Sequence, residues 1–145
     1  MSYIDGFVIA APTASRQEVI DYAARFDPMF LELGALRVVE CWGVDVPHGT
    51  VTDFHRAVQA KDEETVMFSW IEWPDKATRD AGMKAMMEDP RMEAANPMPF
   101  DGKRMIFGSF DLRDEFFAKH QLNYMGDIVR VLHYTAKRFN FYDVM

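Results

Sequence analysis

Two histidines near the middle of the chain are spaced so that they could act together. His48 and His55 lie seven residues apart, with Gly49 between them. They could converge over a pocket as acid–base groups or as two metal ligands, with Asp45 or Asp53 close by in the chain. Because the spacing shows no clear third ligand, we favour two solvent-exposed loop histidines. CxxC, HExxH and EF-hand spacings are missing from the sequence, so neither a metal site nor a cofactor is predicted.

Polar residues interrupt otherwise apolar, strand-like segments at several positions, among them Asp5, Glu40 and Ser69. Burying such a group without a partner costs about 1–3 kcal/mol, so each needs a reason to be there. If they face the interior, Glu40 and Asp5 are candidates for a general base with a raised pKa, and His55 is a third. Ser69 is a candidate ligand-binding residue. Edge exposure or a structural ion pair is the commoner outcome for such carboxylates, so no residue is assigned as catalytic.

The segment from Met98 to Ile106 contains a charged pair beside a turn. Asp101 and Arg104 could orient a polar ligand, because a guanidinium offers a planar fork to a carboxylate. The alternative, which we favour, is that Asp101 belongs to the turn before the last strand. Arg104 would then pair with an acid such as Glu40 or Asp5.

Aromatic residues are concentrated on the strand-like segments. Trp42 and Trp70 could line a pocket for a planar ligand, together with Phe68 and Trp73. Such aromatic stripes are more often core or dimer interface, and we favour that interpretation. Trp42 and Trp70, with His48, stay among the candidate ligand-binding residues.

Composition narrows the class of protein. The 145 residues fit one domain, and 49% are hydrophobic, enough to bury a core. Of the charged residues, 18 acids and 11 bases lie in residues 1–110, so no basic patch suggests nucleic-acid binding. No apolar run could span a membrane and the start does not resemble a signal peptide, so we expect a cytoplasmic protein. The single cysteine, Cys41, is expected to be a buried, inert thiol.

The elements that must position these residues alternate in type along the chain. Strands are predicted over residues 3–10, 35–43, 66–73 and 104–110. A helix is predicted over 76–88 with Asp75 as its cap, and a short helical turn should follow with Asp89 as its cap. A first helix should begin at a capping box, Ser15 to Glu18, end before Gly34, and be kinked or interrupted near Pro28. In the second helix, Ala77, Ala81, Ala85 and Met86 are expected to point inward. The order βαββαβ predicts an α+β, ferredoxin-like fold, with helices on one face of a four-stranded antiparallel sheet.

The strands carry apolar residues on both sides, although an antiparallel sheet with one wet face should alternate. Something must therefore cover the second face, and a second copy of the chain is the simplest cover. This predicts a homodimer. The connection from Asp45 to Glu64 is longer than ordinary loops and is predicted to carry a helical turn, Phe54 to Val58, capped at Thr52-Asp53.

Five segments resemble the bacterial YbaA-like family, a family without known function: YIDGFV from Tyr3, GAL from Gly34, VMFSWI from Val66, DPR from Asp89 and MPFDGKRMI from Met98. The resemblance covers residues 1 to about 110. It implies a ferredoxin-like domain over 1–110 that forms a dimeric α/β barrel. It brings no established activity and no agreed catalytic residues. Residues 111–145 extend beyond the usual family end, and we predict a helical extension packed on the partner subunit.

Together these features lead us to expect a homodimer that binds a small molecule in a barrel pocket, between the sheet and the long loop. The wider dimeric α/β-barrel group includes cofactor-free monooxygenases, haem-handling enzymes and plain small-molecule binders. One alternative is therefore an enzyme resembling cofactor-free monooxygenases, with Glu40 or His55 as its base. The other is a non-catalytic structural or regulatory dimer. No membrane or nucleic-acid partner is expected.

Overall fold

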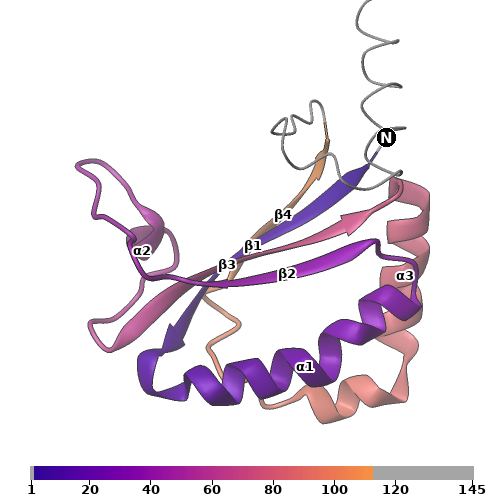
Figure 1. Ribbon diagram of the computed structural model, residues 1–145, viewed down its shortest axis with the longest axis horizontal. Helices are drawn as coiled ribbons and strands as arrows, with labels where there is room; N and C mark the ends of the chain where they lie inside the picture. Colours follow the sequence, from indigo (N-terminus) through magenta and orange to yellow (C-terminus); the bar gives the residue numbers. More distant parts are fainter. Residues whose placement is uncertain (1, 113–145) are drawn as a thin grey trace, which may run out of the picture. The chain divides into compact units, whose positions relative to one another are not determined.

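Four strands form one antiparallel sheet in the computed structural model, which describes residues 2–112 (Figure 1). The strands are β1 (Tyr3–Pro12), β2 (Arg37–Trp42), β3 (Glu64–Trp73) and β4 (Ile106–Asp111). Their order across the sheet is β2-β3-β1-β4, and each neighbouring pair is antiparallel. This arrangement confirms the predicted α+β, ferredoxin-like fold. The predicted helical extension lies, from residue 113 onward, outside the described residues.

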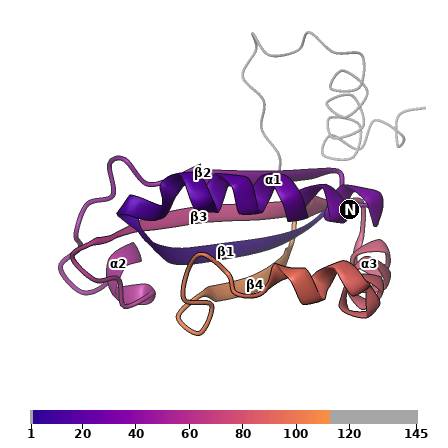
Figure 2. The same cartoon turned by 90° about the horizontal axis from the view of Figure 1, so that it is seen from below.

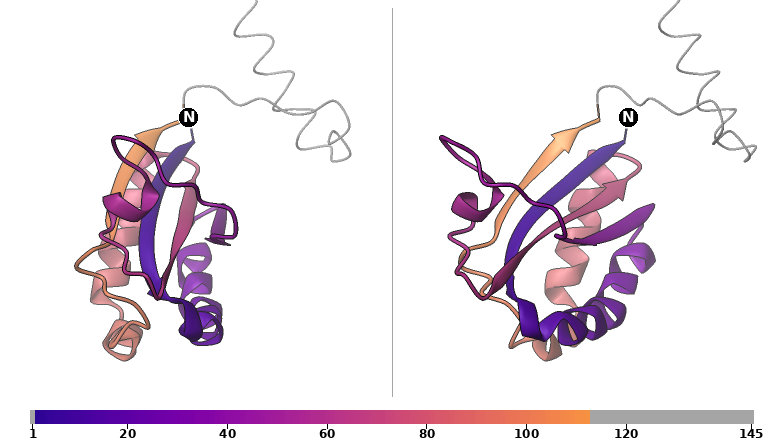
Figure 3. Two further views of the ribbon diagram at one scale, coloured as in Figure 1. Left: turned by 90° about the vertical axis from the view of Figure 1, so that its left-hand side faces the viewer. Right: turned by 60° about the vertical axis from the view of Figure 1, so that its left-hand side comes forward.

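Two longer helices lie against one face of the sheet. These are α1 (Arg16–Glu32), which runs lengthwise along the strands, and α3 (Lys76–Glu88), which is followed by the 3-10 helix η2 (Pro90–Ala95) (Figure 2). A one-turn helix, α2 (Phe54–Ala57), lies on the opposite side of the sheet (Figure 3). The long loop therefore covers part of the face that the two long helices leave open.

Aspartates begin three of these helices, as the sequence predicted. Asp75 accepts a 2.7 Å hydrogen bond from the amide of Thr78, and Asp53 accepts one of the same length from the amide of Arg56. Asp89 accepts a bond from the amide of Arg91 in η2. Each carboxylate satisfies an amide that has no partner within its helix.

The predicted capping box at Ser15 is wrong. A 3-10 turn, η1 (Thr13–Ser15), leads into α1, and Ser15 has φ −92° and ψ 18° rather than an extended backbone. Its hydroxyl therefore makes no capping hydrogen bond. The interruption considered at Pro28 is also absent, because α1 continues through it. Pro28 and Ala24, whose carbonyl loses its helical donor, are both exposed, so water can replace the missing bond.

The buried face of α3 differs from the predicted one. Gly82 and Met86 are buried, whereas Ala77, Ala81 and Ala85 are exposed. A Cβ on Gly82 would lie 2.9 Å from the carbonyl oxygen of Leu33 and 2.9 Å from the ring of Trp73. The helix approaches the core at the residue without a side chain, and this approach turns the alanines outward.

Side chains on the two faces of the sheet meet different partners. Ile9 of β1 packs under α1 with Val19 and Met67, whereas its neighbours Val8 and Ala10 pack with Val58 beside α2. Beyond α2 the second face stays open, and it exposes Phe68, Ile106 and Phe110, the last to 60%. Within residues 2–112, no helix is both long and apolar enough to cross a membrane.

Candidate functional site

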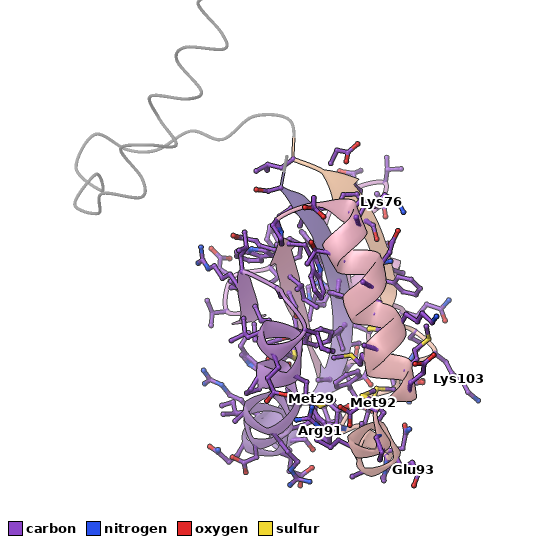
Figure 4. All side chains as sticks on the ribbon, turned by 90° about the vertical axis from the view of Figure 1, so that its right-hand side faces the viewer. Met29, Lys76, Arg91, Met92, Glu93 and Lys103 are labelled. Atoms are coloured by element: carbon purple, nitrogen blue, oxygen red, sulfur yellow. The ribbon has the colours of Figure 1, made fainter. Side chains whose placement is uncertain are left out.

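A cavity of about 150 Å³ lies between α1 and the sheet. Its walls are largely apolar and come from α1, the central strands and the α3–η2 segment; they include Phe7, Ile9, Val19, Phe26, Phe30, Met67, Ile71, Met86, Met92, Ala95 and Phe100. Met29 and Met92 lie where α1 meets η2, and Arg91 beside them bonds Glu32 at 2.9 Å and so ties η2 to the end of α1 (Figure 4). Four polar side chains interrupt this lining: Tyr22, Asp27, Glu40 and Ser69.

Glu40 and Ser69 are neighbours across the paired strands β2 and β3. The Ser69 hydroxyl donates a 2.6 Å hydrogen bond to Glu40 Oε2, and Ser69 itself is only 2% exposed. Burial raises the pKa of Glu40, and the bond from Ser69 opposes that rise. The raised pKa of Glu40 has the direction predicted from the sequence, but the residue is exposed rather than interior, and a catalytic role stays a prediction. One carboxylate oxygen is tied to the neighbouring strand.

Asp27 brings a second carboxyl to the same cavity from α1. Burial raises the pKa of Asp27 to about 7, and the negative charge of Glu40 adds to the rise. The pKa of Tyr22 is raised as well, first by burial and then by the charge of Asp27. At neutral pH the Asp27 carboxyl therefore retains its proton far more often than an ordinary aspartate does. The cavity presents a hydrogen-bond donor from Asp27 close to an acceptor, Glu40.

Asp5, the other carboxylate considered as a base, is engaged elsewhere. It is 3% exposed, and it accepts hydrogen bonds from Trp73 Nε1 at 3.0 Å and from Arg79 Nε at 2.9 Å. The Ser109 hydroxyl donates to it as well. Asp5 does not line the cavity. Its hydrogen bonds form a structural network that joins β1, β3, β4 and α3.

Asp101 and Arg104 also form a local ion pair, with a bond of 2.9 Å. The main partner of Arg104 is Glu64, whose two carboxylate oxygens lie 2.7 and 2.6 Å from its terminal nitrogens. Arg104 also donates to the carbonyl of Gln59 at 2.8 Å. Neither Asp101 nor Arg104 lines the cavity. Their geometry joins the loop before β4 to β3, and a role in ligand binding stays a prediction.

The remaining candidates are spread over both faces of the sheet. Trp42 packs against the core under α1, with the Arg16 guanidinium 5.6 Å from its ring centroid, whereas Trp70 bonds Glu72 on the open face. His48 and His55 come together in the long loop, with ring centroids 4.4 Å apart. Among the nine predicted candidates, the cavity thus unites Glu40 and Ser69 alone.

Asp27 and Tyr22 are the polar cavity residues that the sequence analysis did not single out. Asp27 follows Val19 by eight residues and Ala23 by four, so it falls on the apolar face of α1. The rule that marked Glu40 and Ser69, a polar residue at an apolar position, would have marked Asp27 too.

Comparison with known sequences agrees with the expected resemblance. A family model described as "Protein of unknown function (DUF1428)" matches residues 2–102. The uncharacterized protein YbaA of Escherichia coli K12 is 55% identical over 112 residues, which is 77% of this chain and 96% of the relative. YbaA of Shigella flexneri shows the same identity over the same shares. The YbaA-like family predicted from the sequence is confirmed.

One solved structure supports the fold. An uncharacterized NIPSNAP domain protein from Burkholderia xenovorans superimposes with a TM-score of 0.52 at 13% identity, over 81% of this chain and 99% of the other. A dimeric ferredoxin-like protein from an uncultured marine organism gives a TM-score of 0.43 at 15% identity, over 76% and 92%. At such identities the first of these structures shows a shared fold and nothing about activity.

Proposed function

The chain belongs to the DUF1428 family of proteins of unknown function, and from this premise we propose that it is a homodimer that binds a small molecule in the cavity under α1. The observation that carries the proposal is the meeting of Asp27, Glu40 and Ser69 in a largely apolar cavity. This cavity lies on the helix side of the sheet, opposite the pocket expected between the sheet and the long loop. The site is thus formed within each subunit.

The size of the cavity limits the ligand. An apolar cavity of about 150 Å³ can hold a molecule of the size of benzene. The volume here is about the same, so a single ring or a short branched chain fits. Phe7, Phe26 and Phe30 in the lining favour an aromatic or planar ligand through ring packing.

The polar groups select among such molecules. Asp27 in its protonated form donates a hydrogen bond, and Glu40 accepts one, so a hydroxyl or carbonyl group on the ligand could be paired on both sides. A carboxylate on the ligand would bring a further negative charge beside Glu40 and would disfavour ionisation of Asp27, and burying it unpaired is costly. We therefore propose a neutral ligand such as a phenol, and we expect anionic analogues to be excluded.

The open face of the sheet supports the dimer. Phe68 and Phe110 are 46% and 60% exposed, and Trp70 contributes a third aromatic ring to the same face. Monomeric proteins rarely expose such contiguous apolar surface. A second copy placed against this face would bury all three residues and leave the cavity on the outer side of each sheet.

An enzyme is the second candidate function, and one observation favours it. Glu40 combines a raised pKa with a position in a largely apolar cavity, which are the properties of a general base. In that case Glu40 would remove a proton from an acidic hydroxyl of the bound ring, as the base of a cofactor-free monooxygenase would. A non-catalytic structural or regulatory dimer would instead leave the cavity without a ligand.

Binding can be tested by thermal shift and by NMR titration. We expect phenol or catechol to raise the melting temperature in a saturable way, and benzoate at the same concentration to have little effect. Quinones extend the screen to redox-active single rings. The variant Ala23→Leu, which fills the cavity from α1, should abolish the phenol effect. Glu40→Gln should weaken the affinity for phenol about tenfold, because one hydrogen bond to a charged group is lost.

A matched control separates the cavity from the surface. Glu72 follows Ser69 by three residues on β3 and faces the open side, so Glu72→Gln makes the same chemical change outside the cavity. It should leave phenol binding unaltered. If phenol shifted Ala23→Leu as strongly as the parent protein, or if no neutral ring in the screen gave a saturable shift, the proposal would be wrong.

A further inference from the structure

Three side chains that could hold a metal ion meet in the loop between β2 and β3, on the opposite side of the sheet from the cavity. His48, Asp53 and His55 each offer one ligand atom, and these atoms all lie within 4.8 Å of one another. The two imidazole rings are 4.4 Å apart and inclined by 33°. His48 Nδ1 lies 3.4 Å from Asp53 Oδ2, a long distance for a hydrogen bond between a ring nitrogen and a carboxylate.

The loop holds the carboxylate firmly. Asp53 Oδ1 accepts from the amide of Arg56 at 2.7 Å, and Oδ2 accepts from the amide of Gly49 at 3.1 Å. Arg56 closes the loop from the other direction by donating to the Gly49 carbonyl at 2.6 Å. A Cβ on Gly49 would lie 2.1 Å from the carbonyl oxygen of Thr52, so the tight loop requires glycine there. The hydrogen bonds that Asp53 and Arg56 make with the Gly49 backbone therefore hold the neighbouring His48 close to Asp53 and His55.

His55 carries the second, independent observation. Its Nδ1 is buried and has no hydrogen-bond partner among residues 2–112. Buried polar atoms nearly always have a partner, and one that does not calls for an explanation such as an ion. The ring of His55 is held beside that of His48, whose side chain is 72% exposed, so an ion can reach the pair from solvent.

We propose that His48, Asp53 and His55 form a binding site for a divalent transition-metal ion of the zinc type. Two imidazole nitrogens and one carboxylate oxygen form a three-ligand set that suits zinc and leaves a fourth position for water. A carboxylate can accept about four hydrogen bonds or ligand contacts, so Asp53 retains capacity beside its two amide donors. The Arg56 guanidinium, 3.4 Å from Asp53 Oδ2, opposes the charge of an ion and limits its affinity.

Titration of the whole protein with the metal alone tests this site. After dialysis against a chelator, we expect calorimetry with zinc chloride to give one saturable site per chain, and cobalt(II) to develop visible absorption bands of a low-coordinate ion. His48→Ala and His55→Ala should each weaken zinc binding at least tenfold. Circular dichroism melts of both variants establish that they remain folded.

Two controls locate the ion. Asp45→Asn removes a carboxylate from the same loop outside the cluster, and it should leave the affinity unaltered. His120→Gln with His133→Gln removes the other two of the four histidines in the chain, and it should also retain binding. The site would be disproved by the lack of a saturable zinc isotherm, by His55→Ala that binds as tightly as the parent, or by loss of binding in the His120/His133 variant.

Discussion

Ser69 and Glu40 form a 2.6 Å hydrogen bond across the antiparallel pair β2–β3, and the residues it joins are 29 positions apart in the chain. The bond holds a carboxylate against the wall of an apolar cavity, where Asp27 approaches from α1. The pairing of β2 with β3 thus fixes the position of Glu40, and the packing of α1 on the sheet places Asp27 at the same cavity. The properties of the site follow from how these two elements are held.

Removing the Ser69 hydroxyl should disturb Glu40. In Ser69→Ala the Glu40 carboxylate loses a hydrogen-bond donor, but Glu40 is exposed and water can replace the hydroxyl, so we expect a loss of about 1 kcal/mol in the free energy of unfolding. The pKa of Glu40 should rise further, because the bond from Ser69 lowers it. Urea denaturation measures the first effect, and a carbon-13 titration of the Glu40 carboxyl measures the second. Ser15→Ala is the control: the Ser15 side chain makes no capping bond, so stability should change little.

Asp27 should make the protein less stable as the pH rises. Its pKa is about 7 in the fold against an ordinary value of 3.8, so between these values the unfolded chain has lost the proton that the folded chain retains. Rising pH therefore favours unfolding, and the full penalty is present above pH 7. As the pH rises from 5 to 8, the free energy of unfolding of Asp27→Asn should therefore increase by about 2 kcal/mol relative to that of the parent. This figure is reduced from the full pKa difference to allow for solvent screening.

Urea midpoints at several pH values check the Asp27 prediction. Asp45→Asn, a change in an exposed loop carboxyl, serves as the reference. The raised pKa of Glu40 also lowers the stability of the fold as the pH rises. The stability of Asp27→Asn should therefore still depend on pH, but less steeply than that of the parent. An unaltered slope in Asp27→Asn would show that its carboxyl is not buried in the way described.

Gly82 should tolerate no side chain. Alanine favours a helix over glycine by about 1 kcal/mol, yet Gly82→Ala should cost about 1–3 kcal/mol, because its Cβ would press on Leu33 and Trp73. The exposed neighbour Ala81 gives the reverse control, since Ala81→Gly should lose only its helix propensity. Thermal denaturation of the two variants distinguishes packing from propensity. A stabilised Gly82→Ala would contradict the close approach of α3 to the core.

The Arg104–Glu64 pair should stabilise the fold more at neutral pH than in acid. The bonds from Arg104 lower the pKa of Glu64 to about 2, so the pair stabilises the fold above pH 4.5 and its contribution is lost as the pH falls through 2. Arg104→Met should lower the urea midpoint at pH 7, and the difference from the parent should shrink toward pH 2. Arg37→Met, which breaks the exposed pair with Glu72, should have a much smaller effect.

A charge on the open face should separate the dimer. Sedimentation of the parent should give twice the 16.8 kDa of one chain, whereas Phe110→Glu or Phe68→Glu should shift the protein toward a monomer. Val51→Glu, in a loop and 91% exposed, adds the same charge and should leave the dimer intact. A folded monomer at dilute concentration for the parent protein would overturn the proposed assembly.

Local signals in the sequence determined the order of the elements, the bounds of α3 and the caps at Asp53, Asp75 and Asp89. Each depends on contacts within a few residues, and a pattern over such a span is visible in the chain itself. The same reasoning went wrong at Ser15, where the preceding turn changed the backbone, and on α3, where close packing at Gly82 turned the alanines outward.

The tertiary structure alone decided which acids meet. Nothing in the spacing pairs Asp27 with Glu40, or selects Asp53 rather than Asp45 as the neighbour of His48 and His55, because these contacts depend on strand register, helix docking and loop closure. A sequence shows that a polar residue falls at an apolar position. Long-range packing decides which other residue it contacts, and local patterns in one sequence do not show that packing.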